Sequence, residues 1–357
     1  MTGAAPMLWI GGRPVGPGQP PLIVAELSGN HNGELARALS LIDAAKAAGA
    51  HAVKLQTYTA ETITLDCDRA CFRIDGGSWA GRRLYDLYGE ASTPWEWHEA
   101  LFARCRQLGL PAFSTPFDSS AVDFLERFDP PAHKIASFEL VDLPLIRHVA
   151  ATGRPMILST GMADGAEIDE AVAAAREAGC RHPVLLHCVS AYPAEPRDAG
   201  LGAIAALAAR TGAAAGLSDH SLGTAVAVAA VALGAVMIEK HLTLRRSDGG
   251  PDAGFSMEPA EFAALVRDCR AAWEATRPAE PDRPTAEDPC RRLRRSLFVV
   301  RDMQAGDVFS SDNVRSIRPA DGLAPRYLDQ ILGRRASQAL ERGTPLAWGM
   351  VKEDGAG

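Results

Sequence analysis

Two histidines stand at the ends of two successive apolar segments of the chain. His220 closes the run Leu217–His220, and His241 closes the run Ile238–His241. Such segments are typical of buried parallel strands, whose carboxyl ends bring their side chains together. Imidazole is a common ligand of divalent ions at neutral pH. The pair predicts an open metal site in which water, a carboxylate or substrate oxygens complete the shell, and Mn²⁺ or Mg²⁺ suits such a site better than structural zinc.

Two lysines, Lys54 and Lys134, each interrupt another short apolar run. Lysine is rarely buried without a partner, and its compact ammonium group suits phosphate or carboxylate. The alternative is a buried salt bridge with Glu26 or Glu239. Further segments end in hydroxyl groups that could donate to phosphate oxygens, although each alone could be a turn residue or a helix cap: Thr115, Ser137, Ser159 and Ser218. Together these residues predict a site for a phosphorylated substrate.

Short apolar runs alternate with longer, alanine-rich periodic segments from residue 21 to about residue 276. The runs predict strands at Leu22–Ala25, Ala52–Leu55, Ala112–Ser114, His133–Ile135, Met156–Leu158, Val184–His187, Ala214–Leu217 and Val236–Glu239. The periodic segments predict helices that include Glu34–Ala48, Trp95–Leu108, Ser119–Phe128, Glu167–Ala178, Leu222–Leu233 and Pro259–Thr276. Eight such units over roughly 250 residues favour an α/β fold, the closed (β/α)8 TIM barrel, over a doubly wound open sheet. In a barrel of this kind the chemistry lies at the carboxyl ends of the strands.

The chain divides into four predicted parts. Residues 1–20 form an N-terminal extension, residues 21–276 the barrel, residues 277–293 a Pro-rich charged linker and residues 294–357 a small C-terminal domain. The interval between Leu55 and Trp95 is too long for a simple barrel loop and carries Trp79, Tyr85 and Tyr88. Because long loops in compact domains are often functional, we expect an insertion above the catalytic face that could act as a lid.

The composition excludes several classes of function. The 357 residues carry a net charge of -7, so we expect no general attraction to nucleic acid or to an anionic membrane. No apolar run approaches the roughly 20 residues of a membrane span, and the start has no signal-peptide core, so we expect a cytoplasmic protein. The seven scattered cysteines predict free thiols rather than disulfides or zinc ligands.

Seven motifs, taken together and in order, resemble the sialic acid synthase family. They are Ala25–Gly33, Val53–Tyr58, Lys134–Ser137, Ser159–Met162, Cys188–Pro193, Leu217–His220 and Ile238–His241. The resemblance runs from about residue 21 to residue 351, and its last part is similar to the antifreeze-like (SAF) domain of these enzymes. It implies condensation of phosphoenolpyruvate with an amino sugar to give a nine-carbon nonulosonic acid.

The resemblance also implies a role for individual residues. The metal ligands would be His220 and His241, and Glu26, Lys54, Lys134 and His220 would be catalytic. Phosphoenolpyruvate would be held by Lys54, Thr115, Lys134, Ser137, Ser159 and Ser218, and the sugar by Gln56, Glu139, Tyr192 and Asp252. Ser190 would also contact substrate, although many relatives have asparagine there. Arg318 would enter the site of the partner subunit, which implies a domain-swapped homodimer.

Within that family, three segments are most similar to the pseudaminic acid synthases: Asp66–Ile74, Leu84–His98 and Arg246–Asp252. This similarity implies 2,4-diacetamido-2,4,6-trideoxy-altrose as the sugar substrate. An N-acetylneuraminate synthase that uses N-acetylmannosamine is the alternative inside the family. A synthase for a phosphosugar and a non-catalytic carbohydrate-binding protein are the alternatives outside it.

Overall fold

The computed structural model describes residues 7–277 and 284–352. Contacts divide the chain into two units, Met1–Thr276 and Arg277–Gly357, and each has a hydrophobic core of its own. Three stretches lie outside the described residues: the first six residues of the predicted extension, residues 278–283 of the predicted linker and the last five residues of the C-terminal domain.

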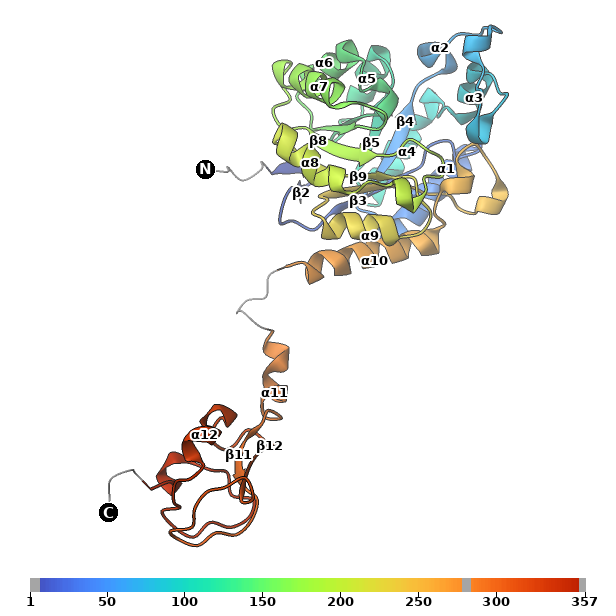
Figure 1. Cartoon of the computed structure of the whole chain (residues 1–357). Helices are drawn as coiled ribbons and strands as arrows, with labels where there is room; N and C mark the ends of the chain where they lie inside the picture. Colours follow the sequence, from blue (N-terminus) through green and yellow to red (C-terminus); the bar gives the residue numbers. More distant parts are fainter. Residues whose placement is uncertain (1–6, 278–283, 353–357) are drawn as a thin grey trace. The chain divides into compact units, whose positions relative to one another are not determined.

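The first unit is a closed barrel of eight parallel strands (Figure 1). Its strands follow one another around the barrel from β3 to β10, and β10 pairs with β3 to close it, so the predicted (β/α)8 fold is confirmed. The strands are β3 (Leu22–Glu26), β4 (Ala52–Thr57), β5 (Ala112–Pro116), β6 (His133–Ile135), β7 (Met156–Ser159), β8 (Val184–Cys188), β9 (Ala214–Asp219) and β10 (Met237–His241).

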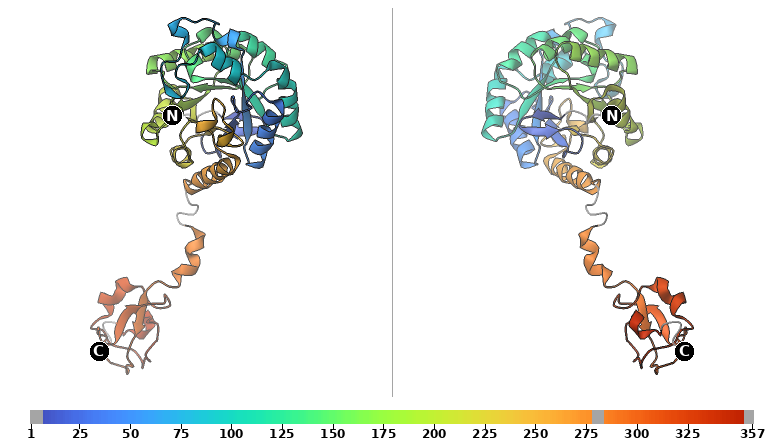
Figure 2. Two further views of the ribbon diagram at one scale, coloured as in Figure 1. Left: turned by 90° about the vertical axis from the view of Figure 1, so that its right-hand side faces the viewer. Right: turned by 90° about the vertical axis from the view of Figure 1, so that its left-hand side faces the viewer.

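Helices form an outer ring around the strands (Figure 2). They are α1 (Leu35–Ala47), α4 (His98–Gln107), α5 (Ser119–Glu126), α6 (Leu143–Ala151), α7 (Gly165–Glu177), α8 (Gly202–Thr211), α9 (Ala225–Ala232) and α10 (Pro259–Ala275). Across the described ranges, none of the helices combines the length and the apolar composition that a membrane span requires.

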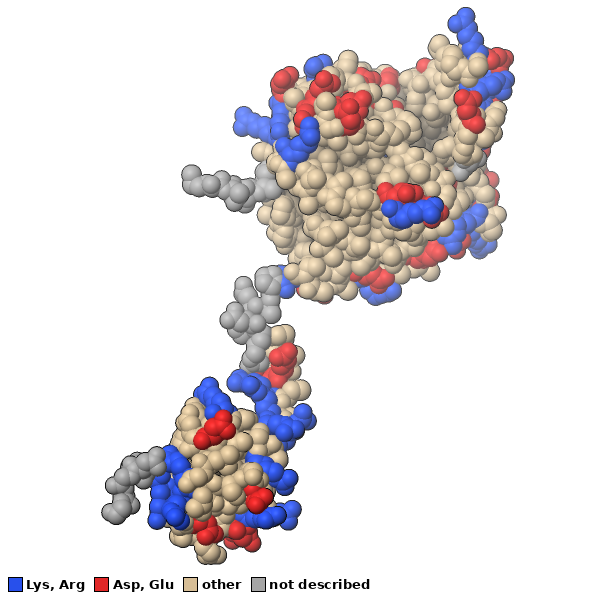
Figure 3. Space-filling view, in the orientation of Figure 1, with Lys and Arg blue, Asp and Glu red and all other residues tan. Residues whose placement is uncertain are grey.

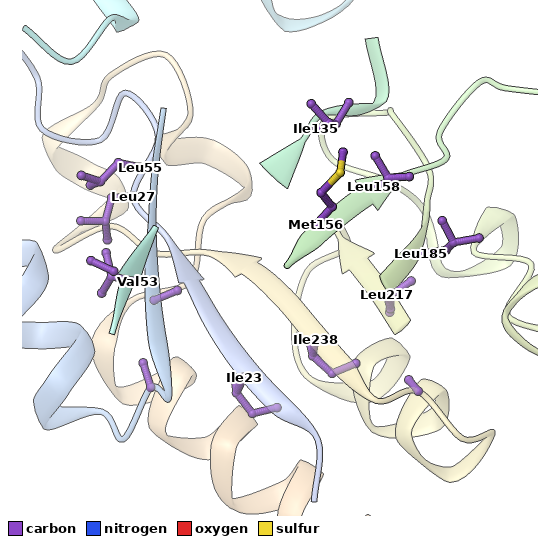
Figure 4. Close-up of a cluster of buried hydrophobic side chains, with 14 of the residues drawn as sticks. Ile23, Leu27, Val53, Leu55, Ile135, Met156, Leu158, Leu185, Leu217 and Ile238 are labelled. Atoms are coloured by element: carbon purple, nitrogen blue, oxygen red, sulfur yellow. The ribbon is translucent and has the colours of Figure 1, made fainter. Parts of the chain in front are cut away.

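Strand residues alternate between two hydrophobic layers, as the two-residue period of a strand requires. On β3, Ile23 and Ala25 point outward into the layer beneath the helices, whereas Leu22 and Val24 point into the barrel. Figure 4 shows part of the outer layer, to which Val53 and the other labelled side chains belong. The same alternation determines which polar residues at the strand ends face the barrel interior.

A short hairpin contributes to the core at the bottom of the barrel. It consists of β1 (Leu8–Ile10) and β2 (Arg13–Val15), joined by Gly11 and Gly12 at positive φ, which suits a two-residue hairpin turn. Ile10 and Val15 are buried and belong to the same cluster as Phe113 inside the barrel. The hairpin therefore adds apolar side chains to the core at the amino end of the barrel.

The long interval after β4 is a folded insertion. It contains the helices α2 (Ala60–Ile63) and α3 (Leu84–Ala91), with the 3-10 turns Ala70–Phe72 and Gly77–Trp79 between them. The helix α4 follows after one more 3-10 turn, Trp95–Trp97. The predicted insertion therefore contains short helices and 3-10 turns, which make up about half of it.

The second unit is small and has short elements. An antiparallel pair, β11 (Ser296–Val299) and β12 (Val314–Ile317), packs with α12 (Leu328–Ile331) around a compact apolar core. It is preceded by α11 (Asp288–Arg291). Lysine and arginine side chains are spread over the visible face of this unit (Figure 3).

Candidate active site

Strand register brings ionisable groups together at the carboxyl end of the barrel. His241 on β10 pairs with Glu26 on β3. Glu239 lies two residues before His241 and therefore points to the same interior side. The intervening Lys240 points outward, where its Nζ lies 2.6 Å from Asp219 Oδ2. Lys240 is thereby separated from the groups that face the interior.

A cavity of about 1020 Å³ opens at this end of the barrel. Its walls and floor include most of the residues that the sequence predicts to bind substrate or metal: Lys54, Gln56, Lys134, Ser137, Glu139, Ser190, Tyr192, Ser218, His220, His241 and Asp252. These residues come from five different strands or the turns after them, and from the loop that follows β10. The barrel therefore assembles one site from residues that lie far apart in the sequence.

Four predicted residues do not line this cavity. Glu26, Thr115 and Ser159 are absent from its lining and are at most 2% exposed. The hydroxyl oxygens of Thr115 and Ser159 have no hydrogen-bond partner among the described residues, although both are buried. Arg318 belongs to the second unit, where its side chain is exposed.

An ion network forms the floor of the cavity. Lys54 Nζ lies 2.9 Å from Glu26 Oε2 and 2.8 Å from Glu239 Oε1. Lys134 Nζ lies 3.6 Å from the same Glu239 oxygen, and Ser218 Oγ donates a hydrogen bond to it over 3.3 Å. The salt bridge that was the alternative interpretation of Lys54 is therefore present, and both lysines nevertheless line the cavity.

The charges of this network follow from burial and proximity. Burial and the neighbouring Lys134 lower the pKa of Lys54 to about 8, although Glu239 opposes the shift. Burial disfavours the Glu239 carboxylate, but the two ammonium groups outweigh burial and lower its pKa. The two ammonium groups are thus paired with the carboxylates of Glu239 and Glu26, but Glu26 does not line the cavity, whereas Lys54 and Lys134 do and can contact an anionic ligand there.

The two imidazoles lie side by side above this network. Their ring centroids are 5.4 Å apart, and both rings line the cavity. His241 Nδ1 is hydrogen-bonded to Ser28 Oγ at 3.1 Å, and His220 Nδ1 to the carbonyl oxygen of Val189 at 3.0 Å. Each ring is thus anchored through Nδ1, which leaves its Nε2 available to an ion.

The two imidazoles of His220 and His241 fit a metal ion that takes most of its ligands from water or substrate. Among the described residues, no group of three or more His, Cys, Asp and Glu side chains is arranged to hold a metal. Burial, with His220 and Lys54, lowers the pKa of His241, so that its ring is neutral and able to ligate. Burial also opposes the charged form of His220, but the hydrogen bond with Cys188 raises its pKa, so protonation of this ring competes with the binding of a cation.

A carboxyl group lies on the side wall of the cavity. Burial raises the pKa of Glu139 to about 7, and its Oε2 has no hydrogen-bond partner among the described residues. Burial likewise raises the pKa of Asp252, whose Oδ2 accepts a hydrogen bond from the Gly29 amide over 3.2 Å. Both groups are positioned to bind a neutral polar ligand such as a sugar.

The sequence prediction did not include every residue that lines the site. Glu239 was considered only as a partner for lysine, yet its position two residues before His241 on one strand was a sufficient signal that it faces the same site. Phe255 also lines the cavity, and its ring lies 4.9 Å from that of His241. Phe255 carried no such signal because it follows an irregular segment after β10.

Comparison with known proteins identifies both units. Residues 41–280 match the NeuB family, and residues 294–352 match the SAF domain. The chain is 43% identical to a pseudaminic acid synthase of Helicobacter pylori over 330 residues, which cover 92% of this chain and 97% of that protein. It is 42% identical to a pseudaminic acid synthase of Campylobacter jejuni over 91% of this chain and 94% of that protein.

A solved structure has the same architecture. It is the N-acetylneuraminic acid (sialic acid) synthetase of Leptospira borgpetersenii in complex with citrate, which superimposes with a TM-score of 0.71 at 31% identity. The superposition covers 80% of this chain and 95% of that chain. Fold, motifs and sequence identity agree, and the chain belongs to the NeuB family, with a C-terminal SAF domain.

Proposed function

We propose that this protein is a pseudaminic acid synthase, which condenses phosphoenolpyruvate with 2,4-diacetamido-2,4,6-trideoxy-β-L-altropyranose and releases phosphate. The observation that carries the proposal is identity above 40% with pseudaminic acid synthases across nearly the whole chain. The structurally similar N-acetylneuraminic acid synthetase is less similar in sequence, at 31% identity. The alternative that uses N-acetylmannosamine is therefore less well supported.

The floor of the cavity suits the phosphate and carboxylate of phosphoenolpyruvate. Lys54 and Lys134 supply two ammonium groups, and the Ser137 and Ser218 hydroxyls line the same cavity. Thr115 and Ser159 do not line the cavity, but their buried hydroxyls have no partner among the described residues, and an unpaired buried polar group costs about 1–3 kcal/mol. A phosphate oxygen that reached them would remove this cost.

The reaction joins carbon 3 of phosphoenolpyruvate to the aldehyde carbon of the open-chain sugar, whose oxygen takes up a proton. Water adds to carbon 2, and the bond between carbon 2 and the phosphate oxygen then breaks to release phosphate. In this scheme Lys54 and Lys134 hold the charged groups in place and stabilise charge that develops during the reaction. Glu26, which contacts Lys54, would act through this lysine rather than on the substrate directly.

A divalent ion, Mn²⁺ or Mg²⁺, would be held by Nε2 of His220 and of His241. Bound there, it would supply Lewis acidity to the aldehyde oxygen. The anchoring of both rings through Nδ1 and the neutral state of His241 support this proposal. Glu139, Gln56, Tyr192, Ser190 and Asp252 would bind the sugar from the side wall.

We further propose that the active form is a domain-swapped homodimer, in which Arg318 enters the site of the second copy. The exposed position of Arg318 on the SAF domain supports this role. An Arg318→Ala protein mixed with a His241→Ala protein should regain activity if the arginine acts in trans. Mixed dimers that form and stay inactive would contradict the proposal.

Seven free thiols suit the reducing cytoplasm, where we propose the enzyme acts.

Phosphate release from phosphoenolpyruvate tests the proposed activity. The purified full-length protein is incubated with Mn²⁺ and with one of several sugars: the diacetamido altrose, N-acetylmannosamine or a phosphorylated pentose. The proposal expects rapid release with the first sugar. Faster release with N-acetylmannosamine would favour the N-acetylneuraminate synthase, and release with the phosphosugar would favour a phosphosugar synthase. No release with any sugar would favour a carbohydrate-binding protein without catalytic activity.

A further inference from the structure

The inserted helix α3 presents one face to the cavity. Leu84, Leu87, Tyr88 and Ala91 line it, at the spacing i, i+3, i+4 and i+7 that places residues on one side of a helix. The side turned away is polar, and Asp86 there forms an ion pair with an arginine of the same insertion. The helix is amphipathic, and its cavity face, apolar except for the Tyr88 hydroxyl, forms one wall of the substrate cavity.

Other parts of the insertion extend this wall. Ile63 from α2 and Ile74, which lies between the two 3-10 turns, also line the cavity. Tyr58 and Phe117 line the cavity as well, and their rings pack edge-on with centroids 4.8 Å apart. The aliphatic wall, defined as Ile63, Ile74, Leu84 and Leu87, carries no side-chain hydrogen-bonding group. The cavity therefore has an aliphatic wall in addition to its charged floor, its polar side wall and the aromatic residues Tyr58 and Tyr88.

Trp79 connects the insertion to the opposite rim of the barrel. Its indole Nε1 donates a hydrogen bond to the carbonyl oxygen of Pro251 over 3.0 Å, and its ring centroid lies 5.4 Å from that of Tyr192. Pro251 follows β10 and Tyr192 follows β8, whereas the insertion follows β4. These contacts hold the aliphatic wall in place over the cavity.

We propose that the aliphatic wall receives the C6 methyl group of the sugar and selects a 6-deoxy sugar against its 6-hydroxy counterpart. The inference rests on the proposed function and assigns its sugar selectivity to Ile63, Ile74, Leu84 and Leu87. A hydroxyl placed against these side chains loses its hydrogen bonds to water and gains none. Hydrophobic pockets discriminate between such substituents by about ten- to hundredfold in kcat/KM.

The test compares two sugars that differ at one position. They are the 2,4-diacetamido-2,4,6-trideoxy-altrose and the same diacetamido sugar with a hydroxyl at C6, each with phosphoenolpyruvate and Mn²⁺. The ratio of their kcat/KM values is measured in the full-length protein. The wild type should prefer the 6-deoxy sugar by about ten- to hundredfold. Leu84→Gln supplies a hydrogen-bonding group to the wall and should reduce this ratio about tenfold, while the KM for phosphoenolpyruvate stays unchanged.

Leu65→Gln is the matched control. Leu65 lies in the same insertion, is 63% exposed and is not part of the cavity lining, so the same substitution there should leave the ratio unchanged. Ile63→Gln provides a second wall variant if Leu84→Gln does not fold. Two results would overturn this inference alone while the 6-deoxy sugar is still turned over. One is a kcat/KM ratio of the two sugars near one in the wild type, and the other is the same ratio in the wild type and in the wall variants. No turnover of either sugar would overturn the proposed function together with it.

Discussion

Glu139 should make the stability of the barrel depend on pH. Its carboxyl group has an ordinary pKa of 4.5, and burial raises the pKa to about 7 in the folded protein. The folded state binds the proton of this carboxyl more tightly than the unfolded state does. The resulting contribution to the free energy of unfolding is fully present below pH 4.5 and is lost as the pH rises through 7. With these two pKa values, the free energy of unfolding should fall by about 2.5 kcal/mol between pH 5 and pH 8 because of this group.

Glu139→Gln removes this titration with little change in shape. The free energy of unfolding of the variant minus that of the wild type should therefore rise by about 2.5 kcal/mol from pH 5 to pH 8. Urea unfolding, followed by tryptophan fluorescence at both pH values, measures the difference. Glu170→Gln removes a carboxylate that is exposed on α7 and serves as the control, for which the difference should stay constant. An equal difference at pH 5 and pH 8 for Glu139→Gln would refute the reasoning.

Three further predictions concern charge, metal and packing. Lys134→Met should lower the turnover number for phosphate release by about 10²–10³-fold, because a lost charged contact in the transition state costs about 2.7–4 kcal/mol; turnover equal to that of the wild type would remove Lys134 from the mechanism. Chelation of divalent ions should abolish phosphate release and added Mn²⁺ should restore it, whereas His220→Ala should bind less manganese by elemental analysis; an unchanged manganese content would exclude His220 as a ligand. Phe113→Ala should lower the free energy of unfolding by about 3–5 kcal/mol in urea titrations, and a loss below 1 kcal/mol would contradict its role in the barrel core.

The strands of the barrel could be predicted because each is a short apolar run buried on both faces. The predicted strand His133–Ile135 coincides with β6, and Val236–Glu239 differs from β10 by one residue at its start and two at its end. Helix ends were harder to predict. The helix expected from Leu222 begins only at Ala225, because Gly223 adopts a positive φ that a helix does not allow.

The sequence indicated which residues belong to the candidate site better than it indicated which of them are exposed to the cavity. The two-residue alternation of the strands indicates that Glu26 and His241 face the interior at the same level. It does not indicate that Lys54 and Gln56 contact the Glu26 carboxylate and that Glu26 is fully buried. Those contacts depend on which long polar side chains pair with one another in the folded protein. The aliphatic wall was equally inaccessible to prediction, since its helices belong to an irregular insertion.

The most direct test of the central claim is a crystal structure of the protein soaked with phosphoenolpyruvate. The claim is that the charged floor at the carboxyl end of the barrel binds this substrate. The account predicts electron density for the phosphate and carboxylate groups within hydrogen-bonding distance of Lys54 and Lys134, in the cavity that His220 and His241 also line. Density for phosphoenolpyruvate elsewhere, with this cavity free of it, would contradict the account.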